Sequence, residues 1–104
     1  MSLNTLTFSV KGDAGAALKA PVHHGVVGSG DMEVLMEPKA QDGAVSVSIV
    51  TPVAGFDDLW KRVLQTFVSQ SGLSDAHLDI NDNNATPAVV LLRLRQAMTE
   101  AQAN

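Results

Sequence analysis

The sequence predicts one α+β domain, a mostly antiparallel sheet of about four to five strands with two helices packed on one face. Short stretches in which polar and apolar residues alternate indicate strands, whereas two longer stretches repeat apolar residues every three or four positions, as helices do. Strands come first, and one more strand separates the two helices. The 104 residues, of which 45% are hydrophobic, suffice for one core, so we expect a single domain over residues 1–104.

Residues 6–10, 44–50 and 76–80 are the stretches with strand-like alternation. The middle one is the most regular, because every second residue from Val45 to Ile49 is aliphatic and the residues between them are serines. The segment between the first strand and Pro21 has small residues and no clear period, so we interpret it as a connection.

A hairpin is expected in the first half of the chain. The apolar runs 24–27 and 32–36 flank the small, turn-forming residues 28–31, a pattern typical of two antiparallel strands and their turn. Ser29 and Gly30 would then form the tip.

The first helix is expected from Phe56, with Gly72 placed to end it. Acidic residues in its first turn, at positions 57 and 58, suit the helix dipole. Its apolar face would comprise Phe56, Leu59, Trp60, Val63, Leu64, Phe67 and Val68.

The second helix is expected over residues 88–103. Thr86 would be its N-cap and Pro87 its first helical residue, and Arg93 and Arg95 would flank its apolar stripe. The polar cluster 81–84 just before it should lie outside the preceding strand.

Composition excludes several classes of function. Without cysteine there is no disulfide, thiolate zinc site, iron–sulfur cluster or cysteine nucleophile. A formal net charge of −4 and a pI near 5.1 disfavour nucleic acid as a partner. No stretch approaches the about 18 apolar residues of a membrane span, and the N-terminus does not resemble a signal peptide. We therefore expect a cytoplasmic protein that binds neither nucleic acid nor membrane.

Catalytic and metal-ligating candidates are few, and we predict neither a catalytic residue nor a metal site. His23 and His24 are adjacent, so on a strand their rings would point to opposite faces. Positions 79, 81 and 83 carry the first oxygen ligands of a calcium loop, but Asn84 and Val90 replace its glycine and its bidentate glutamate. No Gly-x-Ser-x-Gly elbow is present, and sequence alone cannot show whether Ser, His and Asp residues form a triad.

Ser29 is the residue best placed for chemistry. It stands between Gly28 and Gly30 at the expected hairpin tip, where a hydroxyl is unhindered. One interpretation is an ordinary turn serine, and the other is a modification site. A serine is a weak nucleophile without a positioned base, so a modifying partner would have to supply that base.

Two blocks of the sequence resemble a known family. Residues 25–35, GVVGSGDMEVL, and residues 80–94, INDNNATPAVVLLRL, are similar to the acyl carrier (delta) subunits of malonate decarboxylase, and more distantly to the gamma subunit of citrate lyase. The family usually has glycine where Asn84 and Ala88 stand. Asparagine tolerates a left-handed backbone, and alanine suits a first helical turn.

The resemblance implies a non-catalytic carrier subunit of a multi-subunit decarboxylase in malonate catabolism. Ser29 would carry 2'-(5''-triphosphoribosyl)-3'-dephospho-CoA through a phosphodiester, with Gly28, Gly30 and Asp31 completing the attachment motif. Acetyl and malonyl groups would travel as thioesters on this arm. The implied partners are the transferase and decarboxylase subunits of malonate decarboxylase, a malonyl transferase and a prosthetic-group transferase.

Two alternatives stay open from sequence. The chain could be a citrate lyase carrier, although the Ala85-Thr86-Pro87 block favours malonate, or a small scaffold module in which Ser29 is only a turn residue. Asp31 could orient the phosphodiester or close the turn, and the turn is the simpler reading, since aspartate is common there.

Overall fold

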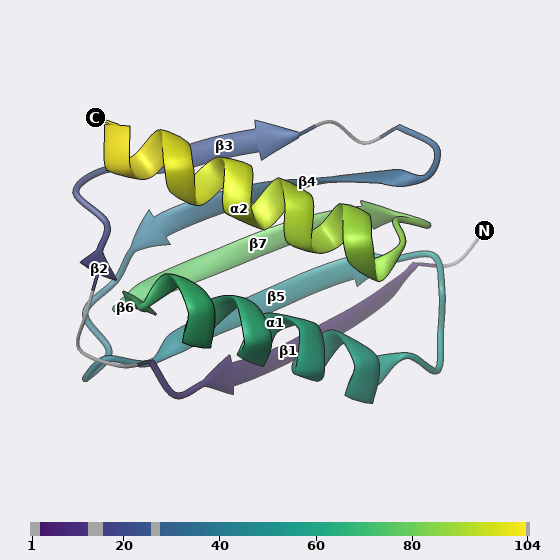
Figure 1. Cartoon of the computed structure of the whole chain (residues 1–104). Coiled ribbons are helices and arrows are strands. Elements are labelled where there is room, and N and C mark those ends of the chain that lie inside the picture. The colour runs from purple at the N-terminus through teal and green to yellow at the C-terminus, as the bar shows by residue number, and fades with distance from the viewer. Residues whose placement is uncertain (1–2, 13–15, 26–27, 104) are drawn as a thin grey trace.

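The computed structural model describes residues 3–12, 16–25 and 28–103. A five-stranded sheet in the order β1-β5-β7-β4-β3 carries both helices on one face (Figure 1). Its strands are β1 (Asn4–Val10), β3 (Val22–Gly25), β4 (Asp31–Pro38), β5 (Val45–Thr51) and β7 (Ala76–Asn83). The helices are α1 (Asp57–Ser71) and α2 (Pro87–Ala103). This arrangement confirms the predicted α+β fold.

Three of the four strand pairings in the sheet are antiparallel, and β5 with β7 is the parallel pair. A parallel pair requires a crossover, which α1 provides between these two strands. In Figure 1, α1 lies over the β1 and β5 side and α2 over the β4 and β3 side. The sheet is therefore mixed but mostly antiparallel.

The core lies between the sheet and the helices. Alternate residues of each central strand are buried against the helices, as the period of two predicts. The sheet contributes Met32, Val34, Met36, Val45, Val47, Ile49, Leu78 and Ile80, and the helices contribute Trp60, Val63, Leu64, Phe67, Val68, Val90, Leu94, Ala97 and Met98.

The first helix confirms the expected ends but corrects part of the expected apolar face. Gly72 ends α1 in a left-handed conformation, and its amide donates to the Val68 carbonyl. Phe56, however, is the N-cap residue and is 50% exposed, and Leu59 is 37% exposed. Both side chains border a pocket instead of filling the core.

Strand β7 continues through Asn83, so the prediction that residues 81–84 lie outside the strand was wrong for the first three. Their backbone pairs with β4, where Asp31 lies opposite Asn83. Two of the polar side chains have partners in the sheet: Asn81 donates to Glu33, and the buried Asp82 carboxylate accepts from the Thr51 hydroxyl and the Ala85 amide. Asn84 leaves the strand with φ of 64°.

The first half of the chain contains one element that the sequence did not predict. A two-residue strand, β2 (Ala16–Ala17), pairs in parallel with β6 (Leu73–Ser74) inside the segment interpreted as a connection. Two residues are too few for a readable period. The hairpin of β3 and β4 is confirmed, although positions 26 and 27 of the expected run lie outside the described residues.

The second helix begins as expected. The Thr86 hydroxyl accepts from the Val89 amide, and Pro87 is the first helical residue. In the described part of the chain, neither helix is long and apolar enough to cross a membrane.

Candidate functional site

The tip of the β3–β4 hairpin presents Ser29 to solvent. Ser29 and Gly30 form the turn, and the Asp31 amide closes it by donating to the Gly28 carbonyl at 3.0 Å. Gly30 has φ of 76°, a conformation that glycine adopts without strain, and a Cβ on it would meet nothing within 4 Å. The expected tip position of Ser29 is confirmed, and the space around it is open.

The tip is also tied to the end of β7. The Gly30 amide donates to the Asn83 carbonyl at 2.7 Å, next to the point where the chain turns toward α2. Ser29 therefore projects from a turn whose backbone is fixed on both sides.

The side chain of Asp31 links the hairpin to α2. Its carboxylate accepts from Arg93 Nε at 2.8 Å and Arg93 Nη2 at 2.6 Å, a bidentate pair across to α2, and also from the Met32 amide. The Arg93 hydrogen bonds, followed by that of Met32, lower the pKa of Asp31 from 3.8 to about 2. The pairing in turn raises the pKa of Arg93.

A polar network extends this contact along α2. Gln96 Oε1 accepts from Arg93 Nη1 at 3.0 Å and lies 2.8 Å from His24 Nε2. His24 Nδ1 lies 2.8 Å from Glu100 Oε1, so both ring nitrogens face acceptor oxygens. We call Asp31, Arg93, Gln96, His24 and Glu100 the hairpin network, since it joins both strands of the hairpin to α2.

The hairpin network bears on the role of Asp31, which the sequence left open. The Gly28 carbonyl and Asp31 backbone close the turn, while the Asp31 side chain is engaged by Arg93. A direct contact of Asp31 with a phosphodiester stays a prediction. Sequence reasoning placed Arg93 only at the side of its helix, and the pairing of residues 62 positions apart left no local signal.

His23 lies on the opposite face of the sheet from His24, as their adjacency on a strand predicts. Its Nε2 is 2.9 Å from Glu33 Oε2, and Glu33 also accepts from Asn81 at 2.9 Å. These two hydrogen bonds, His23 first, lower the pKa of Glu33. The two histidines therefore have separate partners and do not converge on one site.

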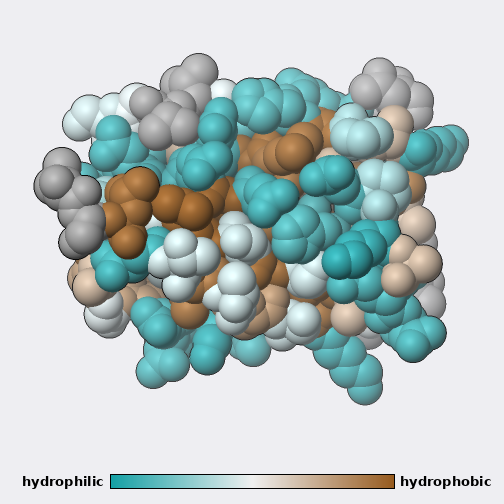
Figure 2. Space-filling view, turned by 180° about the vertical axis from the view of Figure 1, so that it is seen from behind, coloured by the Kyte–Doolittle hydropathy of each residue, from teal (hydrophilic) through white to brown (hydrophobic). Residues whose placement is uncertain are grey.

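One Ser-His-Asp row, which sequence could not reveal, crosses the helix-free face of the sheet. His77 Nδ1 is 2.6 Å from Ser46 Oγ, and His77 Nε2 is 3.1 Å from Asp79 Oδ1. The row lies on adjacent strands whose backbone amides are engaged in the sheet, so no pair of amides faces the serine as an oxyanion hole. Figure 2 shows this face as polar residues around an apolar strip. We therefore interpret the row as hydrogen-bonded polar side chains at the surface of the sheet.

The calcium-like spacing also lies on a strand. Asp79, Asn81 and Asn83 occupy alternate positions of β7, an extended segment that does not wrap around an ion. Among the described residues, no cluster of three or more acidic or histidine side chains could hold a metal.

Comparison with known proteins gives a consistent family. The family model described as "Malonate decarboxylase delta subunit (MdcD)" matches residues 19–101. A malonate decarboxylase acyl carrier protein of Malonomonas rubra is 48% identical over 101 residues, covering 96% of this chain and 90% of that protein. One from Stenotrophomonas maltophilia is 41% identical over 97 residues, covering 92% of each.

A solved structure agrees with the sequence relatives. The chain is similar, with a TM-score of 0.83 and 36% identity, to a chain in the crystal structure of a Pseudomonas malonate decarboxylase hetero-tetramer in complex with malonate. The similarity covers 94% of this chain and 98% of that one. The chain therefore belongs to the malonate decarboxylase delta subunit family of acyl carrier proteins.

Proposed function

We propose that this protein is the acyl carrier subunit of a malonate decarboxylase and that Ser29 is its attachment residue. The observation that carries the proposal is the exposed Ser29 at a hairpin tip that Arg93 fastens to α2. The family membership supports the carrier function, and the Gly28-Ser29-Gly30-Asp31 motif supports the position.

The residues around Ser29 fit a covalently attached arm. The tip has room for a bulky substituent, because the Ser29 side chain is exposed. The group that we propose, from 2'-(5''-triphosphoribosyl)-3'-dephospho-CoA, supplies the thiol that carries acetyl and malonyl groups as thioesters. The chain, which has no cysteine, supplies only the anchor.

Attachment requires a separate transferase. The Ser29 oxygen forms a bond to one phosphorus, and because a phosphodiester keeps a single phosphate, the rest of the triphosphate leaves as diphosphate. The serine proton must pass to a base, and the nearby candidates are engaged: both carboxylate oxygens of Asp31 bind Arg93, and both ring nitrogens of His24 face acceptors. The base therefore belongs to the transferase, and the carrier itself is non-catalytic.

The proposed partners are other subunits of the decarboxylase. The similar Pseudomonas chain occurs in a hetero-tetramer of malonate decarboxylase, which supports assembly with transferase and decarboxylase subunits. An exposed arm on an anchored hairpin could bind at the active sites of more than one such subunit.

Intact-protein mass spectrometry tests the proposal. Co-expression with the prosthetic-group enzymes of a malonate decarboxylase system should add the mass of the arm to the wild-type chain. The adduct should be absent from Ser29→Ala and present in Ser69→Ala, which alters an exposed serine of α1. An adduct that persists in Ser29→Ala would refute the assignment. A wild-type chain that stays unmodified while the same enzymes modify a related carrier would refute the carrier function.

A further inference from the structure

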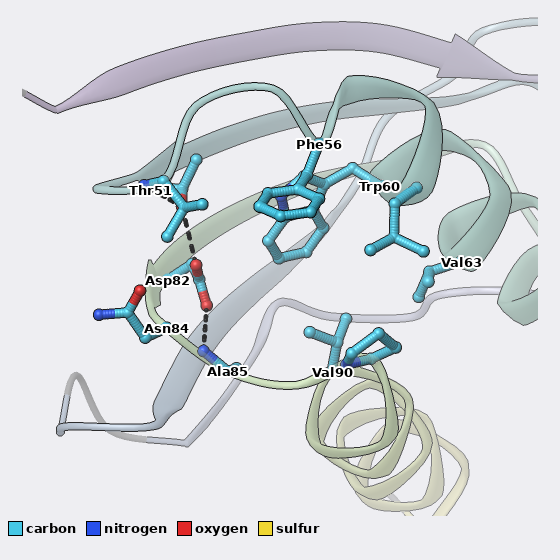
Figure 3. A pocket seen from close by; sticks show the side chains of 11 residues that line it. Thr51, Phe56, Trp60, Val63, Asp82, Asn84, Ala85 and Val90 are labelled. Atoms are coloured by element: carbon cyan, nitrogen blue, oxygen red, sulfur yellow. Dashed lines mark hydrogen bonds between the residues drawn. The ribbon is translucent and has the colours of Figure 1, made fainter.

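A pocket opens between the first turns of α1 and α2 (Figure 3). Its volume is about 290 Å³, close to the lower limit of small-molecule sites. The apolar part of its wall comprises Val53, Phe56, Leu59, Trp60, Val63, Ala85, Pro87 and Val90. Phe56 is 50% exposed, and covering such apolar surface with a neutral apolar ligand is favourable.

The pocket lies close to Ser29. The Gly30 amide is hydrogen-bonded to the Asn83 carbonyl, and the next residue, Asn84, lines the pocket. Neighbouring Cα atoms are about 3.8 Å apart, so Ser29 is separated from the pocket edge by on the order of 10 Å. A group tethered to Ser29 would reach the pocket at a high effective concentration.

A carboxylate forms part of the pocket wall. Asp82 is 7% exposed and accepts from the Thr51 hydroxyl at 2.8 Å and the Ala85 amide at 2.9 Å, as the dashed lines in Figure 3 show. Both of its carboxylate oxygens thus accept a hydrogen bond. A second anion brought beside it, away from bulk water, would be repelled more strongly than at the surface.

The two helix N-termini do not make the pocket favourable for an anion. A helix start favours an anion, but the first turn of α1 already carries Asp57 and Asp58, and Asp82 lies beside the start of α2. Carboxylates of the protein itself thus already lie near both helix starts. The pocket therefore combines an apolar wall with a local excess of negative charge, which selects a neutral ligand.

We propose that this pocket is a resting site for the acetyl-loaded end of the arm on Ser29 and that Asp82 keeps the malonyl-loaded end out. The proposal rests on the proposed function. The acetyl thioester is neutral and apolar, whereas the malonyl thioester carries a free carboxylate. The carrier would thus shelter its acetyl form and leave its malonyl form exposed to partner subunits.

Trp60 provides a direct readout, because it is the one tryptophan of the chain and lines the pocket. A ¹⁵N-labelled sample gives one indole signal, and intact mass first establishes which acyl group each sample carries. The acetyl-loaded carrier should show a shifted Trp60 indole signal relative to the unmodified chain. The malonyl-loaded carrier should give a signal that coincides with that of the unmodified chain.

Two pairs of variants separate the contributions of shape and charge. Ala85→Phe fills the pocket and should abolish the acetyl-dependent shift, whereas Leu92→Phe, at a 50% exposed position of α2, should keep it. Asp82→Asn should give the malonyl-loaded carrier the shift of the acetyl form, whereas Asp42→Asn, at an exposed loop position between β4 and β5, should not. Circular dichroism establishes that each variant folds, and the wild-type comparison stands if one does not.

The outcomes distinguish this inference from the proposed function. A complete adduct with an acetyl-loaded signal that coincides with the unmodified one would overturn the pocket proposal and leave Ser29 as the anchor. Equal shifts for acetyl and malonyl would overturn the exclusion by Asp82. Lack of any adduct in the presence of competent enzymes would overturn the proposed function, and the pocket proposal with it.

Discussion

The two ends of the sheet are built differently. At one, which we call the closed end, the chain segments around Gly12, residues 38–44 and Asp75 meet tightly. The Asp75 carboxylate accepts from the backbone amides of Gln41 and Gly43 at 2.8 and 2.9 Å, and these contacts lower the pKa of Asp75. The Gln41 side chain donates to the Ala76 carbonyl, so this end is held by a dense set of hydrogen bonds.

The other end, which we call the open end, comprises the Ser29 turn, residues 51–56 and residues 82–87. Here Asp82 also binds a backbone amide and a hydroxyl, but the helix starts stand apart and leave the pocket. The hairpin is held from the side by Asp31 and Arg93 and keeps its tip exposed. Similar carboxylate contacts thus close one end and frame a cavity at the other, where we place the function.

The largest expected effect comes from adding one methyl group at the closed end. In Gly12→Ala the new Cβ would lie 2.2 Å from the Gly43 carbonyl oxygen and 2.8 Å from that of Leu73, both backbone atoms. We expect a loss of about 3 kcal/mol in unfolding free energy, the range of overpacked sites, measured by urea denaturation.

Gly30→Ala is the matched change at the open end. Its Cβ meets nothing within 4 Å, so only the positive φ of 76° opposes the substitution, at a cost of about 1 kcal/mol. Equal losses for the two variants would contradict the distinction between a closed and an open end.

Thr51→Val tests the carboxylate at the open end, with an intermediate effect. The variant keeps the shape but removes the hydroxyl that donates to the buried Asp82 and accepts from the Val53 amide. A buried charged group that loses a partner costs about 2 kcal/mol, which urea denaturation at pH 7 should show. Thr7→Val, at an exposed position of β1, is the control. An unchanged free energy of unfolding in Thr51→Val would mean that water replaces the lost hydroxyl and that the pocket holds more water than we infer.

The smallest expected effect is the pH dependence from Asp31. Its folded pKa of about 2 lies below its ordinary value of 3.8, so its contribution is complete above about pH 4 and is lost as the pH falls toward 2. The wild-type chain should therefore lose its stability advantage over Asp31→Asn in this window, as thermal denaturation across the pH series measures. A difference that stays constant from pH 7 to pH 2 would mean that the Arg93 pair does not stabilise the fold. Asp58→Asn controls for the change in net charge.

Sequence patterns predicted the elements whose signals are local. The structure confirms three elements that local patterns predicted. They are the strand from the alternation in residues 44–50, the helix from the apolar spacing around Trp60 and Leu64, and the helix that starts at Thr86-Pro87. The turn at Ser29 was also predictable from neighbouring residues alone.

Features that depend on distant residues were missed. The length of β7 was underestimated because Asp82 finds its partners at Thr51 and Ala85, which no local pattern connects. The pairing of Asp31 with Arg93 likewise joins a strand to a helix that folds much later in the chain. The pocket was also missed, because Phe56 was expected on the buried face and instead begins the helix at the surface, where it lines the pocket.

The measurement that tests the central claim most directly is a tryptic peptide map of the modified wild-type protein. Cleavage after Lys19 and Lys39 releases residues 20–39, in which Ser29 is the one hydroxyl-bearing side chain. We predict that the whole prosthetic-group adduct is found on this peptide. An adduct on any other peptide, with residues 20–39 at their unmodified mass, would contradict the assignment of the anchor to the open end.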